Sequence, residues 1–325
     1  MTVASVAVSP WTDRAAWADF VAKSPQGSVF LRPEMLDALD VEWTPWRLTG
    51  PRDETRAAAI VLSDSAGRPA RSPLPFCLYQ GVALPAASSA GPAHRRVRES
   101  LEATTALLDG LADQSRMSWC LHPSLADLRA FSWFHYHERA LGRFQIDLRY
   151  TGVIPIDPLG GVDAVLAGAR SVRRQEYRKA GQRFIVEASR DLDLLDRLHG
   201  STFARQGVAR DDRERRLLRA LTGAALEHGF GDLLVARSAD DGSPAGAVVF
   251  LHDARTTYYL VAATDPAFRR SGASTLLFMA GVAAGIRRGV QAVDVVGMNS
   301  PGRGDFKTSL GARLVPYFVV DWEQP

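Results

Sequence analysis

The chain has 325 residues, of which 46% are hydrophobic and 23% are charged. This length and composition indicate a globular protein with two domains or one large domain. Its net charge of +3 is too small to indicate a nucleic-acid-binding protein by itself. No apolar run approaches the roughly 18 residues that a membrane-spanning helix needs.

The N-terminal stretch MTVASVAVSPWTDRAAWADF has no basic region ahead of its apolar residues and reaches Pro10 and Asp13 early. This pattern is not typical of a secretory signal, so we expect a cytoplasmic protein. Cys77 and Cys120 lack the spacing of metal ligands. We therefore expect two buried thiols rather than a disulfide or a zinc site.

Helices and strands are expected to alternate through the first half of the chain. Helical spacing and turn residues predict helices near 13–23, 33–40 and 94–114. Apolar runs that end at turn residues predict strands near 44–49, 57–62, 118–123 and 143–154. The Pro- and Gly-rich stretch 68–94 also contains apolar residues, which favours a packed loop over a flexible linker.

The second half repeats this alternation. Helices are predicted near 161–180, 192–206, 211–228 and 273–288, and strands near 183–188, 232–238, 245–252, 256–264 and 292–298. A doubly wound dinucleotide-binding fold is disfavoured, because no Gly-rich turn after a first strand is followed by an acidic residue at the usual distance. We predict a mixed α/β (α+β) protein with two domains, residues 1–155 and 156–325.

Basic residues concentrate in RSVRRQEYRKAGQR, residues 170–183, beside a single acidic residue. Residues four apart share a helix face, so several of these cations are stacked and repel one another unless an anion neutralises them. Phosphates of tRNA or of a sugar nucleotide are candidate anions, and a solvated basic face without a ligand is the alternative. The candidate substrate-binding residues here are Arg170, Arg173, Arg174, Tyr177 and Arg178.

The segment AATDPAFRRSGAS, residues 262–274, joins an apolar strand to a long helix. Backbone N–H groups and the dipole at a helix start suit a phosphate or another anion, and Gly272 would let the anion come close. An ordinary capped helix is the alternative. The candidate donor-binding residues are Arg269, Arg270 and Gly272.

The stretch VVGMNSPGRGDFKTSLGARLVPYF, residues 295–318, places many turn residues after a strand and then Phe306 and Lys307. Turn residues that dense can hold one lysine against a reacting centre, or they can simply form a loop with a surface lysine. Asn299 and Arg303 are further candidates in this loop, where they could line a donor or acceptor pocket or merely make turns.

Aromatic residues crowd the segment FSWFHYHER, residues 131–139. Such crowding usually indicates a core. A cleft wall is the alternative, with Tyr79, Trp133 and Tyr136 as contacts for an acceptor. His135 and His137 alternate along the segment, but no third ligand is evident, so we expect no metal site.

The segment around residues 262–274 resembles the core of the GNAT acyltransferase superfamily. Its strand, turn, helix and following strand are similar to the GNAT core, whose pyrophosphate-binding loop reads Arg/Gln-x-x-Gly-x-Gly/Ala. Arg269 and Gly272 match this loop, whereas Ser274 departs from it at the last position. The departure weakens the case for tight acetyl-CoA binding.

The second half resembles a narrower group, the Fem-type aminoacyltransferases. The similarity rests on RSVRRQEYRKAGQRFIVEAS (170–189), on TFARQG (202–207) and on GMNSPGRGDFKTSLGARLVPYF (297–318), which is similar to the Phe-Lys-x-x-x-Gly region of that group. Looser similarity covers 24–39, 72–81 and 131–156. Because Fem-type proteins consist of two GNAT-like domains in tandem, the resemblance implies that fold, with the acyl-transfer site in the second domain.

The resemblance implies a reaction in which an amine of an acceptor attacks the aminoacyl ester of a charged tRNA and forms an amide. It also implies that Lys307 lies near the tRNA end or the developing oxyanion, where one donor commonly contributes about 3 kcal/mol, and that Phe306 supplies its main chain and a wall. No general base is nominated, because a desolvated amine loses its proton readily and the ester is already activated. Charged tRNA is then a co-substrate and no cofactor is expected.

The expected acceptor is a peptidoglycan precursor or a small peptide-like natural product, as in antibiotic biosynthesis. Two other functions stay open. A related branch of polysaccharide biosynthesis shares the aromatic-Lys pair, which implies an acyl-CoA-dependent N-acyltransferase. A protein of another class would use the basic helix to hold nucleic acid or a phosphorylated ligand without catalysis.

Overall fold

A computed structural model of the chain describes residues 7–86, 92–205 and 211–325. The chain forms two compact units, Met1–Arg149 together with Pro316–Pro325, and Tyr150–Val315. The expected boundary after residue 155 therefore lies a few residues late, and the expected second domain also included residues that belong to the first unit. The reason is that the last strand, β11 (Arg313–Glu323), pairs with β4 (Arg116–Cys120) of the first unit.

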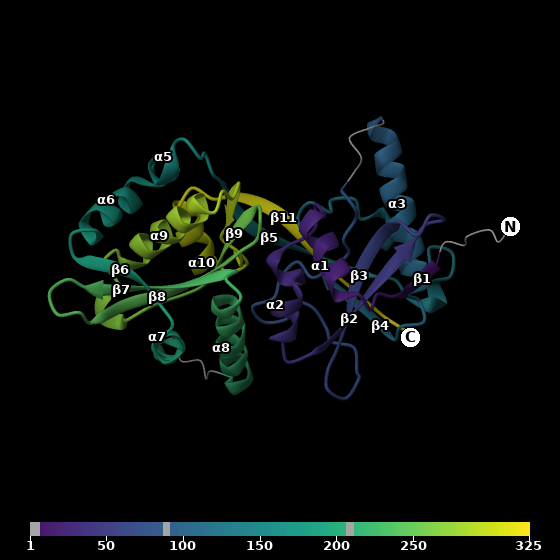
Figure 1. Ribbon diagram of the computed structural model, residues 1–325, viewed down its shortest axis with the longest axis horizontal. Coiled ribbons are helices and arrows are strands. Elements are labelled where there is room, and N and C mark those ends of the chain that lie inside the picture. Colours follow the sequence, from purple (N-terminus) through teal and green to yellow (C-terminus); the bar gives the residue numbers. More distant parts are fainter. Residues whose placement is uncertain (1–6, 87–91, 206–210) are drawn as a thin grey trace. The chain divides into compact units, whose positions relative to one another are not determined.

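The first unit contains a small antiparallel sheet in the order β1-β2-β3 with helices around it (Figure 1). Its long helix α3 contacts all three strands. The elements are β1 (Ala7–Pro10), α1 (Arg14–Lys23), η1 (Val29–Leu31), α2 (Pro33–Asp37), β2 (Glu42–Thr49), β3 (Thr55–Ser63), α3 (Ala93–Gly110), β4, α4 (Arg129–Trp133), η2 (Arg139–Leu141) and the first residues of β5 (Gln145–Pro155).

The core of the first unit forms around Trp119 of β4. Its ring is 1% exposed and its indole N–H donates to the carbonyl of Ile60 at 2.7 Å, so the buried polar atom has a partner. Val320 and Trp322 of β11 belong to the same core. Both cysteines are buried thiols, and burial, with the nearby Cys120, raises the pKa of Cys77 well above its ordinary value.

The second unit is a twisted sheet covered on both faces by helices (Figure 1). Its strands follow the order β5-β10-β9-β8-β7-β6, and all neighbours are antiparallel except β10 and β9. The elements are α5 (Gly161–Gly168), α6 (Ser171–Ala180), β6 (Phe184–Ser189), α7 (Leu192–Arg205), α8 (Asp212–Glu227), β7 (Gly231–Ser238), β8 (Pro244–His252), β9 (Thr256–Thr264), η3 (Pro266–Phe268), α9 (Ala273–Arg287), β10 (Ala292–Asp294) and α10 (Pro301–Ser309).

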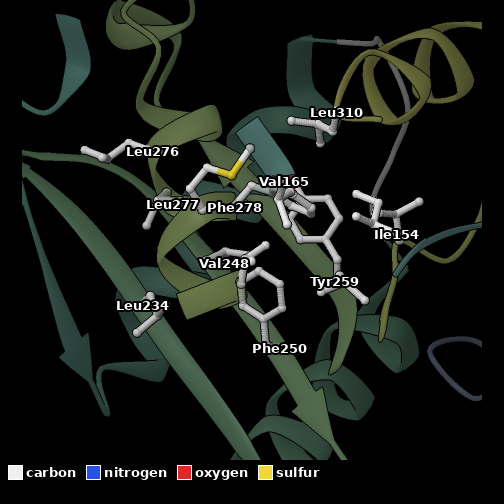
Figure 2. Close-up of a cluster of buried hydrophobic side chains, with 14 of the residues drawn as sticks. Ile154, Val165, Leu234, Val248, Phe250, Tyr259, Leu276, Leu277, Phe278 and Leu310 are labelled. Carbon is white, nitrogen blue, oxygen red and sulfur yellow. The ribbon is translucent and has the colours of Figure 1, made fainter. Parts of the chain in front are cut away.

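Helix α9 packs on one face of this sheet, against β7, β8 and β9, while α7 and α8 cover the other face. The helix is apolar nearly all round because sheet and neighbouring helices cover it. Figure 2 shows Phe250 and Tyr259 of the sheet against Phe278 of α9, with ring centroids 5.2 to 6.4 Å apart. Gly281 permits this packing, since a Cβ there would lie 1.9 Å from the ring of Phe250.

The helix expected over 161–180 is two helices, α5 and α6. The chain is extended at Ala169 and Arg170, and the N–H of Arg170 donates to the carbonyl of Ser309 at 2.9 Å. Arg174 then donates to the carbonyls of Ala167 and Ala169, which closes the C-terminal end of α5. The break is set by a residue distant in sequence, which helical periodicity alone does not reveal.

The loop expected around Asn299 and Arg303 is a helix from Pro301 onward. Pro301 suits the first helical position because its missing N–H would have no partner there. No helix within the described ranges is both long and apolar enough to cross a membrane.

Candidate active site

Strands β9 and β10 run in parallel over three residue pairs, from Ala292↔Thr256 to Asp294↔Tyr258, and then separate. Strand β10 ends at Asp294, whereas β9 continues to Thr264. A register shift between β8 and β9 leaves one extra residue, Leu260, which bends β9 at this point. We call the place where the pairing ends the strand fork.

The segment after β10 stays with β5 on its other side. The N–H of Val295 donates to the carbonyl of Gly152 at 2.8 Å. Further along, the amide of Asn299 accepts from the N–H of Tyr150 at 2.9 Å and donates to its carbonyl at 3.1 Å, as a strand partner would. The fork therefore opens toward β9 only.

Two consecutive residues of this segment have left-handed backbone, with φ of 38° at Val296 and 51° at Gly297. The left-handed region is costly for a β-branched residue, so the surroundings must hold Val296 in place. Lys307 does so from α10, because its ammonium donates to the carbonyl of Val296 and to that of Gly297 at 3.4 Å.

Lys307 is 9% exposed, and its Nζ lies 5.7 Å from the centre of the Tyr259 ring. A cation over an aromatic face is attracted by the ring, more strongly when water is excluded. The structure therefore places the one ammonium of this region at the strand fork, in partial burial, and held by main-chain carbonyls and an aromatic ring.

Phe306, the neighbour of Lys307, packs at the edge of the core. The guanidinium of Arg173 lies 4.7 Å from the ring centre, donates to Ser309 Oγ at 2.8 Å and pairs with Glu176 at 2.6 Å. The structure thus brings together two predicted site residues from segments that are more than a hundred positions apart. Their contact joins α6 to α10.

The other candidate residues of α6 contact their own unit. Arg170 pairs with Asp305 at 3.0 Å, and both side chains are more than half exposed. Arg178 makes a 3.4 Å contact with the carbonyl of Arg174, and Tyr177 packs against the core. Carbonyls and carboxylates therefore offset much of the repulsion that the sequence suggested, and a phosphate is not required for this purpose.

Gly272 begins α9 with φ of 84°. A Cβ there would lie 2.8 Å from the carbonyl oxygen of Glu176, so the glycine lets α6, rather than an anion, come close. The carboxylate of Glu176 accepts from the hydroxyl of Thr275 at 2.6 Å, which places a negative charge against the first turn of α9. Arg269 and Arg270 are exposed nearby.

The departure at Ser274 also has a structural role, because its hydroxyl lies 2.6 Å from that of Thr264 on β9. Asn299 lines a shallow depression of about 360 Å³ together with Met298, Ser300, Pro301, Gly304, Thr308 and Leu314. The side chain of Arg303 lies outside the described residues, as does part of the 202–207 segment.

The first-unit candidates separate into two environments. Tyr79 is 1% exposed and packs edge-on against Tyr317, so it lies in the core rather than on a wall. Trp133 and Tyr136 are 52% and 54% exposed, with Arg129 over the first ring and Arg143 over the second. Among the described residues, no group of three or more His, Cys, Asp or Glu is placed to hold a metal.

Part of the chain, including this site, matches a known family. Residues 167–308 match the family described as acetyltransferase (GNAT) domain, and these residues include α6, the strand fork and Lys307. This part of the chain is therefore similar to a GNAT acetyltransferase domain. No curated protein gives a significant match to the sequence.

Solved structures extend the likeness to the whole chain. The crystal structure of FemX has a TM-score of 0.68 at 14% identity and covers 95% of this chain and 96% of FemX. A conserved protein of unknown function from Bacteroides thetaiotaomicron VPI-5482 scores 0.56 at 11% identity, over 98% of this chain and all of the other. A tandem GNAT protein from the clavulanic acid biosynthesis pathway scores 0.52 at 13% identity, over 98% of both chains. The predicted Fem-like, tandem GNAT fold of mixed α/β class is confirmed.

Sequence reasoning missed Asp294, Thr151, Tyr259, Glu176 and Ser309, all of which contact predicted site residues or the segment that holds them. One signal was available for the lysine itself. Of the 39 Lys and Arg residues, only Lys23, Lys179 and Lys307 are lysine. A lysine at this position of an arginine-rich chain indicates a requirement for a compact ammonium.

Proposed function

We propose that the protein transfers an aminoacyl group from an aminoacyl-tRNA to an amine acceptor, in the cytoplasm, and forms an amide. The coarse class, a GNAT-type acyltransferase, follows from the family match and the fold. The observation that carries the finer proposal is the partly buried ammonium of Lys307 at the strand fork, beside the main chain of Phe306.

In the proposed reaction the acceptor nitrogen attacks the ester carbonyl of the donor. The C–N bond forms, the C–O bond to the terminal ribose breaks, and the proton lost by the amine is balanced by the proton gained by the ribose oxygen. Lys307 exchanges one of its main-chain acceptors for the oxygen that becomes negative during attack. A preorganised donor in such a place commonly supplies about 3 kcal/mol of barrier lowering.

Two observations favour a tRNA donor over acyl-CoA. The carboxylate of Glu176 lies against the first turn of α9, where a pyrophosphate would need positive charge. Ser274, which replaces the expected small residue of the pyrophosphate loop, uses its hydroxyl in a hydrogen bond with Thr264. Arg170 and Arg178, the most exposed of the α6 candidates, are then the cations proposed to contact the phosphates at the acceptor end of tRNA.

The acceptor is proposed to be a peptidoglycan precursor or a small peptide-like natural product. Within the second unit, the depression beside Asn299 is the proposed contact for it. An acyl-CoA-dependent N-acyltransferase stays the second candidate, because Arg269 and Arg270 are exposed beside the start of α9.

The test is incubation with a mixed pool of charged tRNAs labelled on the amino acid, using the wild type, Lys307→Ala and the control Lys23→Ala. Selective protection or consumption of one aminoacyl-tRNA by the wild type and by the control, with loss in Lys307→Ala, is the expected result. If no charged tRNA is recognised while a thioester from a panel of acyl-CoAs is consumed, the second candidate replaces the first.

A further inference from the structure

We propose that Asp294 is a positioning residue for Lys307, and that Thr151 fixes Asp294 for this purpose. The placement of Lys307 that this inference describes can be tested without any substrate. Its importance for turnover rests on the proposed function.

Asp294 is the last residue of β10 and is 4% exposed. One of its carboxylate oxygens, Oδ1, accepts from the hydroxyl of Thr151 at 2.5 Å and from the N–H of Val296 at 2.8 Å. Thr151 is fully buried on β5, the strand that also pairs with β10. Two hydrogen bonds converge on this one buried oxygen, so the Asp294 side chain is a rigid anchor.

Asp294 acts on Val296, the residue whose backbone conformation needs support. Val296 has the unfavourable φ of 38°, and its N–H is held by Asp294 while its carbonyl is held by Lys307. A residue whose N–H and carbonyl are both hydrogen-bonded keeps a backbone conformation that it would otherwise leave. Asp294 therefore sets the direction in which the Val296 carbonyl points, and that carbonyl sets the place of the ammonium.

The neighbouring strand confines the movement further. A Cβ at Gly152 would lie 2.3 Å from Met298 Sδ and 2.8 Å from the side chain of Val295, so the segment after β10 lies directly against β5. It therefore cannot shift toward β5, and release of the Asp294 bonds would let it move toward the open side of the fork. Lys307 would lose its carbonyl acceptors and become accessible to water.

The test uses the small number of lysines as an internal scale. The protein is treated with a trace of acetate N-hydroxysuccinimide ester, and acetylation of Lys307 is compared by peptide mass spectrometry with that of the exposed Lys179 and Lys23. In Asp294→Ala we expect the Lys307 to Lys179 ratio to rise about tenfold, and in Asp294→Asn, which keeps an acceptor oxygen, to stay within about twofold of the wild type.

A second pair of variants guards against simple unfolding of Asp294→Ala. Thr151→Val removes the supporting hydroxyl and is expected to raise the ratio about threefold, whereas Thr151→Ser is expected to restore the wild-type value. An unchanged Lys307 to Lys179 ratio in Thr151→Val and in a folded Asp294→Ala overturns the inference. So does an equal rise at all three lysines, since that reports general loosening.

Turnover separates this inference from the proposed function. With the donor that the wild type uses, Asp294→Ala is expected to lower kcat with KM little changed, and Asp294→Asn to retain most of it. If the labelling ratio changes as expected and no charged tRNA is consumed by the wild type, the positioning role stands and the proposed donor falls. If the wild type consumes charged tRNA and the ratio does not change, the positioning role falls alone.

Discussion

Two buried polar groups contact strand β9 near its start, and they are satisfied in different ways. Where β9 still pairs with β10, His252 of β8 is 3% exposed and its ring nitrogens contact Thr257 Oγ1 at 2.9 Å and Asp232 Oδ2 at 3.1 Å. Arg288 donates to the other oxygen of Asp232 at 3.0 Å. The partners in this network are side chains, three of them on strands β7, β8 and β9 and the fourth, Arg288, at the C-terminal cap of α9.

At the fork, in contrast, Lys307 depends on the main-chain carbonyls of two residues with positive φ. A closed side-chain network on regular backbone ties strands and helix together, and loses free energy when any member is removed. An ammonium held by carbonyls of a strained turn can exchange them for the oxygen of a substrate. The comparison therefore assigns stability to the His252 network and chemistry to the ammonium of Lys307.

The largest effect is expected from Lys307→Arg. The charge is kept, but a planar guanidinium does not fit between the Val296 carbonyl and the Tyr259 ring as a compact ammonium does. We expect the rate of acyl transfer to fall about 100-fold, with little change in the melting temperature. Lys23→Arg is the matched control on the surface of the first unit, and full activity in Lys307→Arg would show that charge alone suffices.

Asp232→Asn is expected to act on stability instead. The loss of a charged partner for His252 and Arg288 should lower the free energy of unfolding by about 2 kcal/mol near pH 7. The transfer rate per folded molecule should equal that of the wild type. Urea unfolding and a transfer assay at matched folded concentration measure the two quantities, and a loss of rate without a loss of stability would reverse the comparison.

The same variant has a pH signature. Burial alone raises the pKa of Asp232, but the bonds from His252 and Arg288 outweigh it and hold that pKa below its ordinary value. A depressed folded-state pKa contributes stability above the ordinary pKa of about 3.9, and this contribution is lost as the pH falls through the depressed value. The difference in stability between wild type and Asp232→Asn should therefore be full near neutral pH and shrink below about pH 4.

Arg173→Ala removes the cation over the Phe306 ring and the bonds to Ser309 and Glu176. We expect the free energy of unfolding to fall by about 1 kcal/mol and the transfer rate to fall about fivefold, because Phe306 and α10 are held less firmly. Arg197→Ala, on the exposed side of α7, is the control. A normal transfer rate in Arg173→Ala would show that the basic helix α6 does not support the site through Arg173.

Glu176→Gln is expected to have the smallest effect. Removing the negative charge from the first turn of α9 should raise the affinity for free CoA about threefold, measured by calorimetric titration. Glu187→Gln, which breaks the pair between edge strand β6 and Arg237 of its neighbour β7, controls for net charge. Unchanged CoA binding in Glu176→Gln would remove one reason for preferring a tRNA donor.

The sequence was sufficient for the fold class because most elements follow local patterns. The Fem-like resemblance rested on whole segments, and α8 shows why such segments are readable. Its cap Asp211 accepts from the N–H of Arg213, and its buried residues Leu217, Leu218, Leu221 and Ala225 recur at helical spacing. The alternation of helices and strands could be predicted from such signals.

The features that build the site were less predictable, because they depend on contacts distant in sequence. The break before α6 depends on the hydrogen bond from Arg170 to the carbonyl of Ser309. Position 272 must be glycine because the main chain of Glu176 lies so close to it. Asp294 looked like an ordinary residue in an apolar strand until the hydroxyl of Thr151 was placed beside it. Spacing within one segment contains none of this information.

The return of β11 to the first unit affects the order in which the protein can be completed during synthesis. Trp322 and Val320 fill the core of the first unit and pair through their strand with β4, although the whole second unit is translated before them. Domains generally fold as units as they leave the ribosome. The GNAT domain, which lies entirely between the two parts of the first unit, can therefore close first, while the N-terminal part of the chain must wait for its final strand.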